Sequence, residues 1–471
     1  MGLSHLTLDG HLLESAVRRG TEQGASFCEA RFFEERSSNI VVENGVAKTL
    51  GSGIARGVGI RVIVNRRWGF ASTNRTTSEE VDKALSDAIG GAKAIATEGI
   101  EDAQVVNQKS ASDSVTHKAK VSPDDVDPAE KVRVMLELDR IARTYSDKVK
   151  DTFTTYRDTV TTTLVHNSFS VRVEEVTPRT YAYCRVISRE GTNLQTGIEY
   201  GGGVAGFEAV NRLQDEQFSR KAAEKAVKLL SAHPPPTGTF SVLVDHRVGG
   251  LFMHEAFGHN SEADSVLAGQ SIIADKMGQQ VASEIVTIVD DPTIPGNGHF
   301  VYDHEGVRAE PHMIVRGGVL VGFLHSLESA AKMNVQPQGS ARARSHQFPP
   351  IIRMSNTYLA PRDMAFDEIL QDMKLGVYLT GMNSGYVETQ KGQFTCKVEQ
   401  GWLIEKGELK DHLRDVSING LTLDALKNIS AVGEDFKMDS PGTCGKMGQG
   451  IPIDAGAPHF RIDGIVVGGR Q

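Results

Sequence analysis

The stretch HPPPTGT, residues 233–239, divides the chain into two parts of different character. Its three consecutive prolines lack the backbone N–H that helices and sheet ladders need, so neither kind of element continues through them. We therefore predict a domain boundary here, with an N-terminal domain at 1–232 and a C-terminal domain at 238–471. The N-terminal domain can be divided further into units of residues 1–120 and 121–232.

Before the prolines, helical and strand patterns alternate. Apolar side chains at helical spacing predict helices over residues 8–22, 77–96, 127–146 and 207–231. Thr77 or Ser78, followed by Glu80, can cap the second of these helices, and Pro128 suits the first turn of the third. The intervening stretches alternate apolar and polar residues, as half-exposed antiparallel strands do. An N-terminal α/β part, an antiparallel sheet with helices, is expected.

After the prolines, the chain consists of short strand patterns separated by glycine turns. Examples are GTFSVLVDH at 238–246, HMIVRGGVLVGFLH at 312–325 and PHFRIDGIVVGG at 458–469. This pattern predicts a mainly antiparallel β domain with a few helices. Taken together, the two parts place the chain in the α+β class.

The overall composition argues against several classes of function. Apolar residues make up 39% and charged residues 24%, and no run approaches the roughly 18 apolar residues of a membrane span. A net charge of -9, without a basic run with interleaved aromatics, argues against nucleic acid as a direct partner. The N-terminus lacks a secretory signal, and four scattered cysteines do not form a disulfide framework. A cytoplasmic location is predicted.

The stretch HEAFGH, residues 254–259, resembles a zinc-peptidase motif with one residue too many. On a regular α-helix, residues five apart lie about 140° apart, so His254 and His259 would point to different faces. They converge if the helix widens by one residue, as in a π-bulge, or breaks at the second histidine. Gly258 tolerates unusual backbone conformations and would permit such a departure. The alternative is two unrelated histidines at a helix end, with Glu255 exposed.

Two histidines need a third protein ligand to form a zinc site. Glu262 and Asp264 follow closely in the sequence, but each could equally be an exposed loop charge. Cys444 is the stronger candidate, because packing does not call for a cysteine in the glycine-rich stretch SPGTCGKMGQG at 440–450. Zinc also favours thiolate. The other three cysteines lie in strand-like stretches and are predicted to be small buried residues.

These residues resemble those of the TldD/PmbA metallopeptidases, in particular the TldD-like, metal-bearing branch. The resemblance is carried by HEAFGH and by later stretches in the family's order, namely RMSNTYL at 353–359, GVYLTGMNSGYVETQKGQFT at 376–395, GWLIEKGEL at 401–409 and CGKMGQGIPIDAGAP at 444–458. It spans the C-terminal half and is looser in the N-terminal half. The stretch NSEADSV at 260–266 departs from the family's usual pattern, which leaves the specificity of this loop open.

The resemblance implies a zinc peptidase with one Zn²⁺ per chain, bound by His254, His259 and Cys444. It implies that Glu255 is the catalytic carboxylate, acting as general base on a metal-activated water. Unfolded or extended peptides would be the substrates, added as a strand to an exposed edge of the β-rich half. Members of the family likewise have an α/β part followed by a β-rich part. The resemblance also implies that the chain forms a dimer, either a homodimer or a heterodimer with a TldE-like paralogue.

Four further residues are candidates for supporting the reaction. Arg353 or His346 could stabilise the charge that develops on the scissile carbonyl, and Asp303 and His304 are candidates of the same kind. An arginine flanked by apolar residues is also commonly a paired structural charge. Two other functions stay open: a hydrolase that depends on Cys444 as nucleophile, and a non-catalytic peptide-binding or regulatory partner subunit. The complete ligand set in one chain argues against the second.

Overall fold

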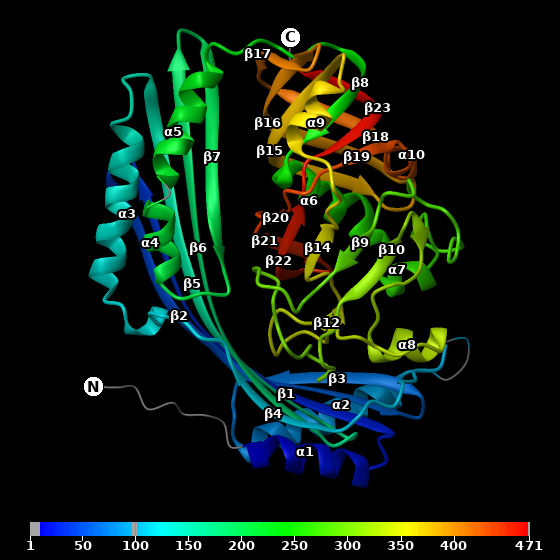
Figure 1. The fold of residues 1–471 in the computed structure, drawn as a ribbon. Coiled ribbons are helices and arrows are strands. Elements are labelled where there is room, and N and C mark those ends of the chain that lie inside the picture. The colour runs from blue at the N-terminus through cyan, green and yellow to red at the C-terminus, as the bar shows by residue number, and fades with distance from the viewer. Residues whose placement is uncertain (1–9, 97–98, 100, 216, 470–471) are drawn as a thin grey trace.

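The computed structural model describes residues 10–96, 99, 101–215 and 217–469 and shows a mixed α+β fold (Figure 1). The predicted class, an antiparallel sheet with helices followed by a mainly β domain, is confirmed. The predicted start of the first helix, at residues 8 and 9, lies outside the described residues. The N-terminal part forms one long curved sheet, and the C-terminal part lies against its concave side.

The N-terminal sheet runs in the order β3-β2-β1-β5-β6, and β6 also pairs with β4 and β7. Its strands are β1 (Phe27–Glu43), β2 (Val46–Val64), β3 (Arg67–Thr73), β4 (Ala111–Thr116), β5 (Val149–Asn167), β6 (Val171–Glu190) and β7 (Asn193–Gly203). Every neighbouring pair is antiparallel except β4 with β6. Strands from both sides of residue 120 therefore share one sheet. The division into domains stays a prediction.

Helices cover the outer face of this sheet in two groups (Figure 1). They are α1 (Gly10–Glu22) and α2 (Ser78–Ala94) at one end, and α3 (Pro128–Arg143), α4 (Glu208–Asp215) and α5 (Phe218–Leu229) at the other, with a short 3₁₀ turn η1 (Pro123–Asp125) before α3. The Thr77 side chain caps α2, as predicted, by accepting the N–H of Glu80. The single helix predicted over 207–231 is wrong, because the chain divides it into α4 and α5 at Gln217, which has a φ of 57°.

The C-terminal part contains a closed barrel. Its strands are β8 (Gly238–Val244), β15 (Leu375–Glu388), β16 (Gln393–Glu405), β18 (Val416–Leu421) and β23 (Phe460–Gly469), in the order β15-β8-β23-β18-β16. A further pairing between β15 and β16 closes the ring, while β17 (Glu408–Leu413) and β19 (Ile429–Val432) pair with β16 and β23. The short helices α9 (Phe366–Gln371) and α10 (Thr422–Lys427) accompany the barrel. Closure removes exposed edges from most of these strands.

A second sheet lies between the barrel and the lower end of the N-terminal sheet (Figure 1). Its strands are β9 (Ile288–Asp290), β10 (His312–Arg316), β11 (Val319–Leu320), β14 (Asn356–Leu359), β20 (Lys437–Met438), β21 (Gly442–Lys446) and β22 (Gln449–Ala457). The order is β11-β10-β9-β14-β22-β20, with β21 also paired to β22. Beside it lie the hairpin of β12 (Ala341–Arg342) and β13 (Ile351–Ile352) and the helices α7 (Ala263–Leu267) and α8 (Leu327–Met333).

Helix α6 (His246–Phe252) joins the barrel to the second sheet, because it packs against β15 of one and β22 of the other. Glycine permits this close packing. A Cβ atom at Gly250 would lie 2.7 Å from the backbone nitrogen of Gly456, a distance that real Cβ contacts do not show. Asp245 fixes the start of α6 by accepting the N–H of Val248. The helical segment that follows α6 is thereby held in one position.

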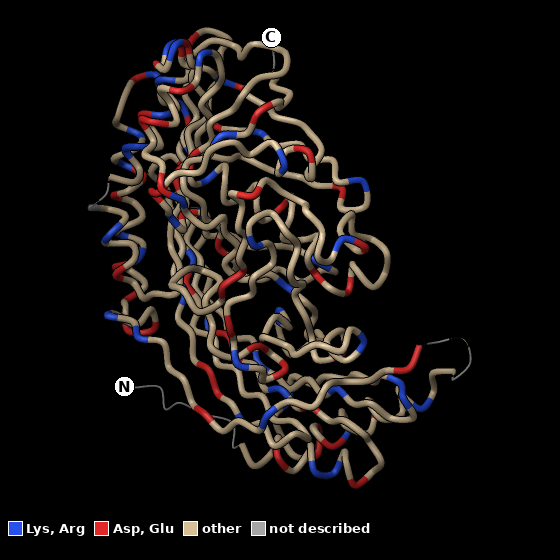
Figure 2. Tube along the Cα trace, turned by 45° about the vertical axis from the view of Figure 1, so that its right-hand side comes forward, with Lys and Arg blue, Asp and Glu red and all other residues tan. Residues whose placement is uncertain are grey.

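Acidic and basic residues are interspersed along the chain (Figure 2). On α3, for example, Glu130 pairs with Arg133 and Glu137 pairs with Arg140. These exposed pairs contribute little stability but keep the two signs of charge mixed. Among the described residues, no helix combines the length and the apolar character needed to cross a membrane.

Candidate metal centre

His254 and His259 lie on one continuous helical segment whose backbone widens between them. Helix α6 passes into a π-helical turn, η2 (Met253–Gly258), and then into the 3₁₀ turn η3 (His259–Ser261). A π turn accommodates one more residue than an α turn, so side chains five apart can lie on one face. The centroids of the two imidazole rings are 5.2 Å apart. The predicted widening of the helix is confirmed.

Gly258 is needed for space and not for backbone freedom. Its φ of -56° and ψ of -49° are ordinary helical values, so the widening does not use the backbone freedom of glycine. A Cβ atom at this position would lie 2.0 Å from Sδ of Met354, a buried residue. The absence of a side chain therefore lets η2 approach the second sheet closely.

The hairpin of β21 and β22 brings Cys444 to the two histidines. Cys444 is paired with Ile451 on the hairpin, and its Sγ lies 3.2 Å from Nε2 of His259. Potential ligand atoms of His254, His259 and Cys444 all lie within 4.8 Å of one another. Two imidazoles and a thiolate form a donor set that zinc prefers, and three protein ligands leave a fourth position open. The residues present thus fit the metal that the resemblance implies.

The environment of Cys444 favours the thiolate. Burial raises the pKa of this thiol, but hydrogen bonds to His254 and His259, together with their charges, lower the pKa to about 5. Burial is the main cause that raises the pKa of Cys28, Cys184 and Cys396, each to about 12. These three are buried in strands, as predicted. Since the thiolate is the form that binds metal, Cys444 is the cysteine suited to that role.

Glu262 contacts His259 on the side away from Cys444. Its Oε2 lies 3.2 Å from Nδ1 of His259 and 3.3 Å from Nζ of Lys446. Burial raises the pKa of Glu262, but His259, Lys446 and Arg353 lower it below its usual value. Such a carboxylate fixes the imidazole tautomer and leaves Nε2 for a metal. Glu262 thus contacts Nδ1 of His259, while Cys444 contacts Nε2 of the same ring. Asp264 pairs with Lys446 at 2.6 Å.

Glu255 lies next to the potential metal ligands and opens on a cavity. Its Oε2 is 4.0 Å from Nε2 of His259, and its side chain is 25% exposed. Together with His254 and Cys444 it lines a cavity of about 250 Å³. A carboxylate in this place can exchange a proton with a molecule held in the cavity.

Both halves of the chain line this cavity. The N-terminal sheet contributes Tyr181, Tyr183, Ile198 and Tyr200 from β6 and β7, and Met382 and Asn383 come from β15 of the barrel. These tyrosines were not predicted from the sequence. Their signal is the alternation along β6, which turns Tyr181 and Tyr183 away from the face that buries Ala182 and Cys184.

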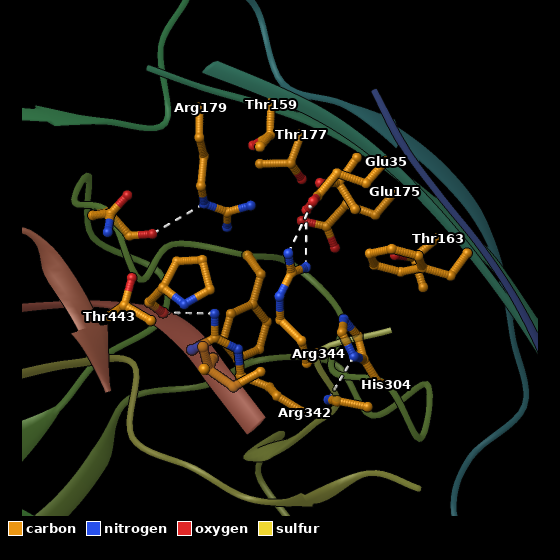
Figure 3. A pocket seen from close by; sticks show the side chains of 18 of the residues that line it. Glu35, Thr159, Thr163, Glu175, Thr177, Arg179, His304, Arg342, Arg344 and Thr443 are labelled. Atoms are coloured by element: carbon orange, nitrogen blue, oxygen red, sulfur yellow. Dashed lines mark hydrogen bonds and ion pairs between the residues drawn. The ribbon is translucent and has the colours of Figure 1, made fainter. Parts of the chain in front are cut away.

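A larger cavity of about 460 Å³ lies between the concave face of the N-terminal sheet and the C-terminal part (Figure 3). Tyr181, Gly442 and Thr443 line both cavities, so the two meet at β21. Across the larger one, both terminal nitrogens of Arg344 contact the Glu35 carboxylate at 3.0 Å. Threonines of the N-terminal sheet form part of the opposite wall, namely Thr155, Thr159, Thr161, Thr163 and Thr177.

The structure does not bring Arg353 or His346 to the described lining of the cavity beside Cys444. The Arg353 side chain is 0% exposed. Its Nη1 donates to the carbonyl of Gln449 at 2.8 Å, and Nη2 donates to the carbonyl of Cys444 at 2.5 Å. His346 packs against the backbone of β2 near Gly57, and burial lowers its pKa.

Asp303 and His304 line the larger cavity instead. The Asp303 carboxylate accepts main-chain N–H groups of Glu305, Val307 and Ala341, and burial raises its pKa well above the usual value. Burial lowers the pKa of His304, whose Nδ1 accepts the N–H of Ala343. These contacts give both residues a structural part in the loop.

Comparison with protein families covers most of the chain. Residues 28–96 match the PmbA/TldA metallopeptidase domain 1, residues 121–230 match the central domain, and residues 237–469 match the C-terminal domain. The chain belongs to the PmbA/TldD metallopeptidase family.

Relatives and solved structures extend this likeness along most of the chain. A protein named metalloprotease from Methanothermobacter thermautotrophicus is 39% identical over 95% of this chain and 96% of its own. A zinc metalloprotease TldD homolog from Saccharolobus solfataricus is 28% identical over 96% of this chain and 99% of its own. The crystal structure of TldE from Thermococcus kodakarensis shares the fold, with a TM-score of 0.78 and 18% identity. The match covers 97% of this chain and 100% of the TldE chain. The crystal structure of a putative modulator of a DNA gyrase from Thermotoga maritima also shares the fold, with a TM-score of 0.77 and 23% identity. The match covers 97% of this chain and 99% of that chain.

Proposed function

We propose that the protein is a zinc-dependent peptidase that hydrolyses peptide bonds of unfolded or extended peptides. The observation that carries the proposal is the convergence of His254, His259 and the low-pKa thiol of Cys444 beside the Glu255 carboxylate. These ligands would hold one zinc ion in this centre. When bound there, zinc would lower the pKa of a coordinated water to about 7 and polarise the substrate carbonyl.

Glu255 is the proton-transfer group in this proposal. Its carboxylate lies beside the ligand atoms and faces the same cavity. It would take a proton from the attacking water and return it to the leaving amine. The position next to His254 in sequence keeps Glu255 close to the reacting atoms without occupying a ligand position.

Arg353 has a positioning role in this proposal instead of stabilising the scissile carbonyl. Its two bonds to main-chain carbonyls hold Cys444 in place and tie both strands of the β21–β22 hairpin together. The tyrosines of β6 and β7 and Asn383 are among the residues with side-chain donors that line the cavity beside Cys444. We therefore assign the stabilisation of the developing oxyanion to this group of side chains, which act best when held in place in advance.

The two adjoining cavities support an extended substrate. Gly442 and Thr443 line both of them, and β21 pairs only with β22 among the described strands. The other edge of β21 can therefore offer main-chain groups to a peptide added as a strand. Main-chain bonds give affinity without reading a particular sequence. The threonines and the paired charges of the larger cavity would contact substrate side chains.

Replacement of Glu255 by glutamine tests the proposal directly. Glu255→Gln keeps the size of the side chain but removes the base, so we expect kcat/KM on casein or a model peptide to fall by about 10² to 10⁴-fold. Zinc content should stay unchanged. Glu190→Gln, at an exposed carboxylate on β6, is the matched control and should retain full activity. Equal activity of Glu255→Gln and wild type would remove Glu255 from the mechanism.

A Cys444-dependent hydrolase is the second candidate function. It is supported by the distance of 3.2 Å between the Cys444 sulfur and the His259 ring nitrogen, which is also the geometry of a thiolate–imidazolium pair. A chelator separates the two reactions. Loss of activity that added zinc restores supports the metal, whereas activity that persists in the chelator supports the cysteine. A chain inactive under every condition would be a non-catalytic peptide-binding partner subunit.

We also infer that the chain works as a dimer, either with itself or with a TldE-like paralogue. The N-terminal half of β2 pairs with β1, and β3 joins its other edge only from Val58 onward. Val46, Leu50 and Ile54 of this segment are 52%, 61% and 66% exposed. An open edge with apolar side chains is a common site of pairing. Light scattering of the chain alone and mixed with a paralogue distinguishes the assemblies. The cytoplasmic location stays a prediction.

A further inference from the structure

A second group of potential ligands lies at the opposite end of the helical segment that carries His254 and His259. His246 begins α6, Asp435 lies between β19 and β20, and His459 lies just before β23. One potential ligand atom of each residue lies within 4.8 Å of the other two. The His246 and His459 rings have centroids 4.5 Å apart. Three separate elements therefore converge on one point.

In each of these residues the second polar atom already has a partner other than the three inward atoms. His246 Nδ1 donates to the Ala457 carbonyl at 2.9 Å, which leaves Nε2 with a free lone pair. Asp435 Oδ1 accepts the N–H of His459 at 3.0 Å, which leaves Oδ2. His459 Nε2 lies 2.9 Å from the Tyr378 hydroxyl, which leaves Nδ1. Outer contacts of this kind orient the ligands of metal sites.

Only two of the three inward atoms are bonded to each other. His459 Nδ1 lies 2.6 Å from Asp435 Oδ2, but His246 Nε2 lies 3.6 Å from the same oxygen, which is longer than a hydrogen bond. A cation between them would bond to all three and replace the proton that His459 and Asp435 share. The side chains of His246 and His459 are 8% and 11% exposed, while Asp435 is 34% exposed and leaves a route from solvent.

We propose that His246, Asp435 and His459 form a second site for a divalent transition metal, separate from the His254, His259 and Cys444 centre. Two neutral imidazoles and one carboxylate suit zinc and neighbouring first-row ions, with room for water in a further position. The chain would then hold two ions and not the one expected from the sequence. Because its ligands come from α6, the β19–β20 loop and the start of β23, the ion would fasten the helix of the first centre to the barrel.

Zinc analysis of the dialysed, full-length chain tests the proposal without any activity measurement. Wild type should hold two zinc ions, and His254→Ala/Cys444→Ala should hold one. Adding Asp435→Asn or His246→Gln to that double variant should remove the remaining ion. His412→Gln, at a half-buried histidine stacked on Trp402, is the matched control and should leave the zinc content unchanged. The proposal is overturned if the double variant holds no zinc, or if its zinc survives loss of the cluster ligands.

Cobalt titration of the intact chain gives a second test that does not need the double variant to fold. Both sites should take up Co²⁺, but the thiolate-to-metal charge-transfer band should accompany only one equivalent. In Asp435→Asn the equivalent without that band should disappear, while the thiolate band stays. Saturation of wild type at one equivalent, or an Asp435→Asn titration identical to wild type, would contradict the second site. Neither outcome depends on whether the protein is a peptidase.

Discussion

The helical segment from His246 to His259 has a cluster of two imidazoles and one acidic group at each end, and the two clusters differ in their surroundings. At the His259 end the acidic group is a buried thiol with a lowered pKa, and Glu255 and a cavity lie beside it. At the His246 end it is a partly exposed carboxylate, and the hydroxyl of Tyr378 is the neighbouring polar group. Similar sets of potential ligands can therefore serve different roles, because a reaction also needs a base and room for a substrate.

The largest expected effect is the loss of a zinc ion when one acidic ligand is replaced, and its consequence should differ between the two clusters. Cys444→Ser removes the thiolate from the first centre, so we expect peptidase activity to be lost together with one zinc ion. Asp435→Asn should instead remove the other ion and lower the melting temperature measured in the presence of zinc. Metal analysis, a casein assay and thermal unfolding measure these effects. If zinc content is unchanged in Cys444→Ser, the third ligand of the first centre lies elsewhere.

A smaller effect is expected at the carboxylate behind His259. Glu262→Gln keeps the shape of the side chain but removes the negative charge beside Nδ1 of His259. We expect zinc affinity at the first centre to fall by about 10 to 100-fold, as is common when the carboxylate behind a ligand histidine is lost. Competition with a chromophoric chelator measures the change, and Glu255→Gln is the control that should keep its affinity. Equal affinity of Glu262→Gln and wild type would mean that His259 is oriented by other contacts.

The smallest effect concerns the packing that supports the π turn. In Gly258→Ala the new methyl would meet Sδ of Met354 at 2.0 Å, so the free energy of unfolding should fall by about 1 to 3 kcal/mol. Gly90→Ala on α2 is the matched control, since nothing lies within 4 Å of its Cβ position, and it should be neutral or slightly stabilising. Urea unfolding of both variants measures the difference. A Gly258→Ala protein as stable as wild type would show that Met354 moves aside freely.

The fold class and the widened turn could be predicted from the sequence because they depend on local patterns, whereas the approach of Cys444 to His259 joins residues 185 apart in the chain. Alternation of apolar residues predicted the sheets, and the five-residue spacing of the histidines required the widened turn that η2 provides. The direction of the Arg353 guanidinium could not be predicted, since it depends on how the β21–β22 hairpin packs. The tyrosines beside Cys444 were missed for a similar reason. They reach the cavity only because the N-terminal sheet curves around the other half of the chain.

The shared walls of the metal-centre cavity have a consequence for the cell. Under the proposed function the reacting groups lie between two packed parts of one chain. Substrates would then be selected by thickness, because a single extended strand is far thinner than two packed sheets, which are about 10 Å apart. Folded proteins would not be cleaved, because they are too thick to enter the cavity. Under the proposed function, such an enzyme needs neither a propeptide nor an inhibitor to coexist safely with intact proteins.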